Sequence, residues 1–369
     1  MPHLRPAPDD LPTPLREVVD YRKSGLSLNH VVGCPLDCAY CVRHMFDGYD
    51  LKRPVVVISD DAAVDQLVSH WAFRRDVTPI QIFNRATDPF LPGVKDHLFA
   101  TVEALDRLEL TNHLLIITRW KVEHADVARL ERLRFLKVTV LVTWSGITDD
   151  RIEPVDSRIA ETSLEVLAAS ARRTRKILYW RPLISGINDT DAHYEKVRAL
   201  AAYADAIAFT GLFMRNQMRA HFKAIGAHDP YDATARRKIL PEHVEQRAIA
   251  AMKGLPVFRK TSCAVAYAHG LADYNGHFGI AELCDICPPA QRERCAATHV
   301  RPDQKTVNTL AEIAGLDAET IAIDDRRIEV SGSSEQQRYF LQHVLNYQVH
   351  DRAHPHHVNR HGRAEIGWS

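Results

Sequence analysis

Three closely spaced cysteines carry the most specific chemistry in this chain. Cys34, Cys38 and Cys41 are separated by three and then by two residues. Soft thiolates held this close can bind three irons of a [4Fe–4S] cube, because one short loop can wrap one face of the cube. With no fourth cysteine nearby, the fourth iron would keep an open coordination site. An open iron can bind a substrate or cosubstrate, which an iron–sulfur cube capped by four thiolates cannot do.

Zinc is the main alternative for this loop. Zinc usually takes four ligands, and its cysteines come as a C-x2-C pair with a second pair further along the chain. A group of three cysteines after an apolar strand matches that arrangement poorly. Buried cysteines can also serve merely as small apolar side chains. The spacing therefore favours the iron–sulfur interpretation.

The cysteine loop, with the aromatic Tyr40 just before its last cysteine, resembles that of radical S-adenosylmethionine (SAM) enzymes. In that family the open iron chelates the amino and carboxylate groups of SAM. An electron from the cluster then cleaves SAM to methionine and a 5′-deoxyadenosyl radical. The resemblance implies a [4Fe–4S] cluster with an open iron, bound SAM and an electron donor such as flavodoxin or ferredoxin.

A Thr-Asp-Pro string follows one predicted strand, where many radical SAM enzymes carry Gly-Gly-Glu. Thr87 and Asp88 begin this string, which resembles the spore photoproduct lyase branch, as does the Gly-Cys-Pro of the cysteine loop. Their hydroxyl and carboxylate supply the acceptors that the SAM ammonium group needs. An Asp-Pro pair is also an ordinary turn or helix start. No cysteine here matches the one with which photoproduct lyases donate a hydrogen atom.

Further polar residues follow later strands. Thr118 and Ser145 offer hydroxyls that could bond the SAM ribose. Ser185 and Asn188 belong to a segment that resembles the family's Pro-x-Ile-x-Gly-x-Asn-Asp turn, where a glycine lets the backbone approach the adenosyl group. Asn188 could equally cap the next helix. Arg181 is expected to pair with the SAM carboxylate in a bidentate way.

A second group of four cysteines, Cys263, Cys284, Cys287 and Cys295, lies further along the chain. Four thiolates that include a C-x2-C pair make a closed metal site. An auxiliary [4Fe–4S] cluster and a structural zinc both satisfy this count. We favour the iron–sulfur cluster because it would accompany a redox enzyme.

Strand-like and helical segments alternate between the cysteine loop and about residue 260. Strands are predicted over Leu26–Val32, Val55–Ile58, Ile80–Phe83, Leu114–Thr118, Val138–Thr143, Ile177–Trp180, Ala206–Phe209 and Val257–Arg259. Helices are predicted over Asp61–Trp71, Gly93–Leu108, Val122–Leu133, Ser157–Arg172 and Asp189–Ala204. Such units imply parallel strands with right-handed crossovers. We predict an α/β fold, a partial (β/α)6-type TIM barrel of the radical SAM kind, with a doubly wound open sheet as the alternative. In the barrel, the active site belongs at the carboxyl ends of the strands.

Composition bounds the partners and the compartment. The chain has 47 basic and 47 acidic residues, so no long-range field draws the whole molecule to nucleic acid, and such binding would need a local patch. No apolar run approaches the ~20 residues of a membrane span, and the start of the chain lacks the apolar core of a signal peptide. Seven cysteines in groups of three and four indicate metal binding in a reducing cytoplasm rather than disulfides.

Four regions are expected. They are an N-terminal lead-in (1–24), a radical SAM barrel (25–262), a four-cysteine segment (263–300) and a small C-terminal α+β module (301–369) that ends in a His- and Arg-rich tail and could bind substrate. The resemblance implies hydrogen-atom abstraction from a substrate, with a nucleic acid or nucleotide favoured. A peptide-modifying enzyme that uses an auxiliary cluster is one alternative, and a non-catalytic zinc or iron–sulfur module that binds nucleic acid is another.

Overall fold

The computed structural model describes residues 4–227, 229 and 238–353. Within these ranges the main sheet has nine strands in the order β11-β10-β9-β8-β7-β6-β3-β2, with β12 beside β10. The strands are β2 (Val19–Arg22), β3 (Gly25–Leu28), β6 (Ile80–Ile82), β7 (His113–Thr118), β8 (Lys137–Trp144), β9 (Arg175–Leu183), β10 (Ala206–Phe213), β11 (Lys238–Ile239) and β12 (Val257–Phe258). Six consecutive strands of this sheet, β3 and β6 to β10, run parallel to one another.

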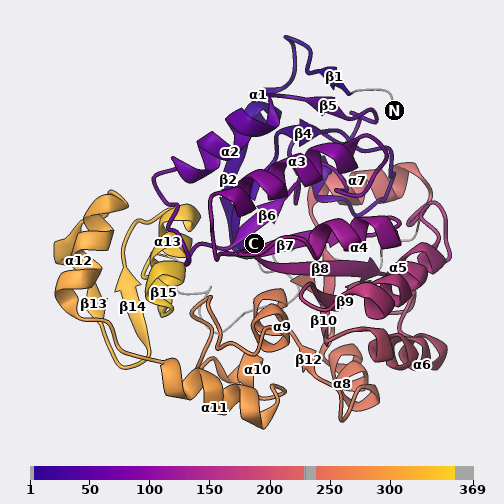
Figure 1. Ribbon diagram of the computed structural model, residues 1–369. Coiled ribbons are helices and arrows are strands. Elements are labelled where there is room, and N and C mark those ends of the chain that lie inside the picture. Colours follow the sequence, from indigo (N-terminus) through magenta and orange to yellow (C-terminus); the bar gives the residue numbers. More distant parts are fainter. Residues whose placement is uncertain (1–3, 228, 230–237, 354–369) are drawn as a thin grey trace.

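One helix joins each pair of successive parallel strands. These helices are α2 (Asp60–Val68), α3 (Val94–Arg107), α4 (His124–Leu130), α5 (Ser157–Ser170) and α6 (Asp191–Leu200), and Figure 1 shows α3 to α6 following one another along the sheet. Each buries an apolar stripe, as α3 does with Val94, Leu98, Val102 and Leu105 at helical spacing. In the described ranges the edge strands β2 and β11 do not pair with each other. The prediction of a partial (β/α)6 barrel is therefore confirmed.

The predicted strand Leu26–Val32 is in fact two strands. β3 ends at Leu28, and the polar pair Asn29 and His30 separates it from β4 (Val31–Val32). β4 instead joins a small sheet of order β1-β5-β4, with β1 at Arg5–Pro6 and β5 at Val55–Val56. The chain thus leaves the barrel sheet before it reaches the cysteine loop, and the predicted strand at 55–58 lies outside the barrel.

Both faces of the main sheet are buried, which explains the nearly continuous apolar strands. In β8, Val138, Val140 and Val142 belong to the core beneath the helices that connect the strands. Leu141 belongs to a separate core on the opposite face. Helix α9 (Thr261–Ala268) packs against β9, β10 and β12 and contributes to this second core. The predicted boundary near residue 262 therefore falls where the chain enters α9.

A small C-terminal module covers the β2 edge of the sheet. Its sheet has the order β13-β14-β15, built from β13 (Ala322–Ile323), β14 (Arg327–Val330) and β15 (Gln348–Asp351), with α12 (Gln304–Ile313) and α13 (Glu335–Leu345). In Figure 1 it stands at the left, in orange and yellow. The phenol of Tyr21 in β2 lies 2.8 Å from Nδ1 of His343 in α13. The module has the α+β composition that was predicted, and most of the predicted His-rich tail lies outside the described residues.

The remaining helices are short. They are α1 (Thr13–Arg16), α7 (Asn216–Ala224), α8 (Glu242–Ala251), α10 (Ala281–Cys284) and α11 (Pro289–Thr298). In the part of the chain that the structure describes, no helix combines the length and the hydropathy that crossing a bilayer requires.

Candidate active site

A pocket opens at the carboxyl ends of the parallel strands and brings the cysteine loop together with the strand ends. Cys34, Cys38 and Cys41 all line it. The strand-end residues in its lining include Asn84, Arg85, Thr87 and Asp88 after β6, Ile117 and Thr118 of β7, Arg119 directly after β7, Thr143 of β8 and Arg181 of β9. These strands meet at one edge because they run parallel, so residues far apart in the sequence converge there.

Glycine is required at the start of the cysteine loop. Gly33 has a φ of +99°, a backbone conformation that residues with a side chain rarely adopt. A Cβ at this position would lie 2.6 Å from the carbonyl oxygen of Arg53. The N–H of Gly33 donates to the carbonyl of Ala86, and that of Cys34 donates to the carbonyl of Leu51. These bonds fix the loop beside the segment that follows β6.

The buried guanidinium of Arg43 holds the loop from within. It donates to four backbone carbonyls, those of Leu36 (3.1 Å), Gly48 (3.0 Å), Tyr49 (3.3 Å) and Leu51 (3.3 Å). Burial disfavours its charge, but the neighbouring cysteines overcome this and raise the pKa of Arg43. A permanent cation therefore lies beside the three thiols, where it favours their anionic form.

The three thiols suit a metal cluster better than a structural role. All three are unpaired, and Cys34 and Cys38 are buried. Burial raises the pKa of both thiols, and the nearby Cys41 raises it further. Thiols whose ionisation is disfavoured in this way can still ionise once iron binds them, because a metal ion supplies the compensating charge. The donor set and its spacing therefore fit three irons of a [4Fe–4S] cube.

Thr87 and Asp88 both line the pocket, but only Asp88 already has hydrogen-bond partners in the protein. The hydroxyl of Thr87 is buried and has no hydrogen-bond partner among the described residues. The carboxylate of Asp88 accepts from the Thr118 hydroxyl at 2.7 Å and from the Arg119 N–H at 2.8 Å, and burial raises its pKa. Thr118 thus orients Asp88, whereas Thr87 offers an unused acceptor to a ligand.

A buried carboxylate that the sequence did not suggest contacts the cysteine loop. Glu153 accepts from the thiol of Cys38 at 3.2 Å and from the phenol of Tyr40, and it pairs with the guanidinium of Arg119. Burial raises the pKa of Glu153 to about 8. Neither spacing nor composition marks this residue, because its partners lie far away in the sequence. The network fixes the loop against β7.

Arg181 is the pocket arginine best placed to meet a ligand. Arg43, Arg85 and Arg119 are each engaged by backbone carbonyls or carboxylates. Arg181 lies over the ring of Tyr179 at 5.5 Å and makes no ion pair in the described ranges. Its guanidinium is therefore available to a carboxylate or a phosphate.

Three predicted site residues do not line this pocket. The hydroxyl of Ser145 accepts from the N–H of Ile147, and Ser185 lies in the turn after β9. The amide of Asn188 is buried and accepts from the N–H of Ile184 while donating to two carbonyls, one of them that of Ser145. These contacts show that Asn188 joins the turn after β9 to the end of β8, while any contact of these three residues with SAM stays a prediction.

The four later cysteines also gather around one cavity. Cys263, Cys284, Cys287 and Cys295 line it together with Asp273, His277, Phe278, Leu283, Gln291 and Arg292. Burial raises the pKa of all four thiols, that of Cys287 to about 12, and neighbouring cysteines add to the effect at Cys263, Cys287 and Cys295. The N–H of Asp273 donates to the sulfur of Cys295 at 3.2 Å. Such N–H···S bonds are typical around metal thiolates.

Two residues beside these cysteines extend the possible donor set. A ligand atom of Cys263, of Asp273 and of His277 lie within 4.8 Å of one another. Burial raises the pKa of Asp273 to about 6. Sequence reasoning missed both residues, although they lie between Cys263 and the C-x2-C pair. The donor set fits either an iron–sulfur cluster or zinc.

The two cysteine sites lie toward opposite ends of one face of the sheet. Ile117 and Thr143 belong to this face and line the first pocket at the carboxyl ends of the strands. The second site lies toward the amino ends, where Tyr274 stacks on His113, the first residue of β7, at 4.3 Å. Helix α9 packs on the sheet between these ends.

The comparisons agree with this architecture. No protein-family model matches the sequence, and no curated protein matches it either. Among solved structures, a variant of spore photoproduct lyase superposes with a TM-score of 0.51 at 13% identity, over 65% of this chain and 77% of that chain. The chain has the fold of spore photoproduct lyase. The predicted radical SAM type of barrel is therefore confirmed as a fold.

Two further solved structures resemble this fold less closely. Spore photoproduct lyase complexed with dinucleoside spore photoproduct gives a TM-score of 0.49 at 12% identity, over 65% of this chain and 77% of that chain. SuiB of Streptococcus suis, bound to S-adenosylmethionine, gives 0.37 at 11% identity, over 53% and 45%. The conclusion about the fold depends on the first comparison alone.

Proposed function

We propose that this chain is a radical SAM enzyme whose [4Fe–4S] cluster is held by Cys34, Cys38 and Cys41. The observation that carries the proposal is the convergence of these cysteines with the unpartnered hydroxyl of Thr87 in one pocket at the carboxyl edge of a radical SAM type of barrel. When bound, the cluster and SAM supply a 5′-deoxyadenosyl radical that abstracts a hydrogen atom from the substrate.

In this proposal the chain's own residues bind the cluster, orient SAM and shield the site from water. The three thiolates hold three irons and leave the fourth open, while Arg43 keeps their loop in shape. Thr87 accepts a hydrogen bond from the SAM ammonium, and Asp88 adds a negative charge beside it. Arg181 pairs with a carboxylate or phosphate of the bound ligand. Burial of Cys34 and Cys38 limits the access of water and oxygen to their thiols.

The proposed substrate is a nucleic acid or nucleotide. The fold of spore photoproduct lyase and the Thr-Asp-Pro string support this class, and Arg181 suits a phosphate. The four-cysteine cavity favours a second candidate, peptide modification with an auxiliary cluster. A non-catalytic module that binds nucleic acid would show no saturable SAM binding, so a SAM titration of the reconstituted protein separates it from both.

Proposals for the other parts follow from their positions. We propose that Cys263, Cys284, Cys287 and Cys295 hold a second [4Fe–4S] cluster, with zinc as the alternative. We also propose that the protein acts in a reducing cytoplasm, and that a flavodoxin or ferredoxin supplies its electrons. For the C-terminal module we propose a role in substrate binding. The module packs on Tyr21 and Trp71, and no described residue of it lines the pocket.

The test is SAM cleavage by the anaerobically reconstituted, chemically reduced protein. We expect 5′-deoxyadenosine, and we expect none when Cys34, Cys38 and Cys41 are all replaced by Ala. Thr87→Val should weaken SAM binding about tenfold, the equivalent of one lost hydrogen bond, whereas Thr87→Ser keeps the hydroxyl and serves as its control. Undiminished product from the triple variant would refute the assignment.

A further inference from the structure

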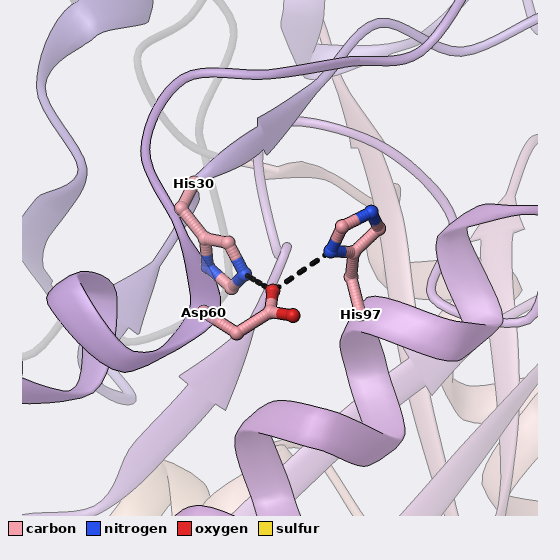
Figure 2. A group of neighbouring side chains, drawn as sticks. All are labelled: His30, Asp60 and His97. Carbon is pink, nitrogen blue, oxygen red and sulfur yellow. Dashed lines mark hydrogen bonds and ion pairs between the residues drawn. The ribbon is translucent and has the colours of Figure 1, made fainter. Parts of the chain in front are cut away.

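A group of two histidines and one aspartate lies outside the pocket, where three separate elements meet. His30 comes from the link between β3 and β4, Asp60 is the first residue of α2, and His97 lies in the first turn of α3. Figure 2 shows both imidazole rings turned toward one carboxylate oxygen from opposite sides. Nε2 of His30 and Nδ1 of His97 each lie 2.8 Å from Oδ1 of Asp60.

Burial and hydrogen bonding shift the pKa values of the three side chains in different directions. Burial lowers the pKa of His30. Burial would raise the pKa of Asp60, but hydrogen bonds from His30 and His97 outweigh it and hold the value at about 2. A neutral imidazole and a carboxylate anion are the forms in which these side chains bind metals. The hydrogen bond that His97 donates to Asp60 raises the pKa of His97, so a metal ion would have to displace that proton.

The three ligand atoms lie close enough to one another to share one ion. All three lie within 4.8 Å of one another. Neighbouring ligands at about 2.1 Å from one ion are about 3.0 Å apart in octahedral geometry and about 3.4 Å apart in tetrahedral geometry. The two nitrogen–oxygen separations of 2.8 Å therefore need to widen by only a few tenths of an ångström. The hydroxyl of Thr101, 3.3 Å from Nε2 of His30, lies beside the same group.

The group can be reached from solvent through two of its three side chains. The side chain of His30 is fully buried, while those of Asp60 and His97 are each 23% exposed. Oδ2 of Asp60 makes no hydrogen bond within the described residues, so the carboxylate keeps a second donor atom. An ion could therefore enter from the solvent side and retain water in its open positions.

We propose that His30, Asp60 and His97 bind a first-row divalent metal ion, zinc or ferrous iron, at a site separate from both cysteine groups. Two imidazoles and a carboxylate are a donor set for these ions. The ion ties the segment that leads into the cysteine loop to the starts of α2 and α3. The ring of His30 packs on Phe83 at 5.1 Å between ring centroids, and Phe83 lines the pocket that contains Cys34, Cys38 and Cys41. The site thus supports one wall of that pocket without taking part in SAM cleavage.

The rival arrangement is a hydrogen-bonded network without metal. In that case Nε2 of His30 keeps its proton and donates to Asp60, and protonated His97 donates to the same oxygen. Nδ1 of His30 is buried without a partner in the described ranges, so no group on that side fixes the tautomer. The experiment must therefore count metal ions rather than measure stability alone.

The test compares the metal content of full-length wild-type, Asp60→Asn and His97→Ala proteins. Each is reconstituted anaerobically so that its cysteine sites are loaded, and is then dialysed against micromolar zinc chloride or, separately, ferrous iron. Elemental analysis should find one more ion per chain in the wild type than in either variant, and the ion that fills this difference at the lower concentration is the preferred one. Asp61→Asn and His124→Ala are the controls, because they remove a charge and an imidazole at exposed positions outside the group.

A second measurement guards against misfolding. Far-UV circular dichroism identifies folded variants, and zinc should raise the melting temperature of the wild type but not that of Asp60→Asn, which keeps the size of the side chain. Equal metal content in the wild type and both folded variants would overturn the proposal, as would a wild type that takes up no ion beyond its cysteine sites. Neither result bears on SAM cleavage, so failure here is separable from failure of the proposed function.

Discussion

Replacing Arg43 by Met should loosen the cysteine loop more than any other single change of a residue that is not itself a proposed ligand. Arg43 is buried, with only 2% of its surface exposed. Met preserves most of the apolar stem but removes both the charge and every donor. Four backbone carbonyls would lose the guanidinium as a donor, although those of Gly48 and Leu51 would each keep a backbone N–H.

The magnitude follows from the number of bonds. Three carbonyls share Nη1 and one is bonded by Nη2, so we count about three effective charge-assisted hydrogen bonds rather than four. Each contributes about 1.5 kcal/mol net. The expected loss in the free energy of unfolding is about 4 kcal/mol. Arg43→Lys keeps the charge but reaches fewer carbonyls, and should lose about half as much.

Urea unfolding of the metal-free proteins measures this loss, and the iron bound after reconstitution measures its effect on the loop. We expect Arg43→Met to bind less iron at the three-cysteine site and to cleave SAM slowly. Arg107→Met makes the same chemical change at an exposed position and should match the wild type in both assays. If Arg43→Met unfolds within about 1 kcal/mol of the wild type and takes up the same iron, the loop does not depend on this guanidinium.

Two further predictions concern other groups. With the first three cysteines replaced by Ala, metal should remain at the Cys284 and Cys287 site, about four irons per chain for a cube or one zinc for a structural site, and a variant without metal would exclude both. In the presence of a chelator, Asp60 should stabilise the fold above pH 4 and lose this effect as the pH falls toward 2, because its pKa drops from 3.8 to about 2 on folding. That difference of 1.8 units corresponds to about 2 kcal/mol. Asp60→Asn should therefore be less stable than the wild type at pH 7, and their unfolding free energies should converge by pH 2, with Asp61→Asn as control; an unchanged gap at pH 2 would contradict the ionic origin.

The sequence was most informative where structure depends on neighbours along the chain. β7 to β10 carry nearly continuous apolar runs because both faces of the sheet are buried, and such runs were recognisable. The cysteine loop was recognisable because its three sulfur donors lie within one short segment of the sequence. The break between β3 and β4 was harder to predict, since Asn29 and His30 interrupt an apolar run whose two halves join different sheets.

Contacts between distant residues could not be predicted in this way. Cys38 and Glu153 are 115 residues apart, and nothing in the sequence indicates that they meet. Asn188 shows the converse case, in which a sequence motif suggests a ligand contact but the fold already uses the side chain. Its place in a family-like turn suggested contact with SAM, but only the structure shows that its amide is already bonded to the backbone on both sides. A residue type indicates which bonds are possible, while the fold decides which are already used.

The position of α13 has a consequence for how the protein is made. The edge strand β2 and Trp71 are translated early, but the residues that cover them, Phe340 and His343, leave the ribosome only after almost the whole barrel. Until then a nascent chain presents an unfinished sheet edge with an apolar flank, a surface prone to pairing with other chains. The first strand of the main sheet is thus among the last to be completed, and chains stalled before α13 should be bound by chaperones or aggregate.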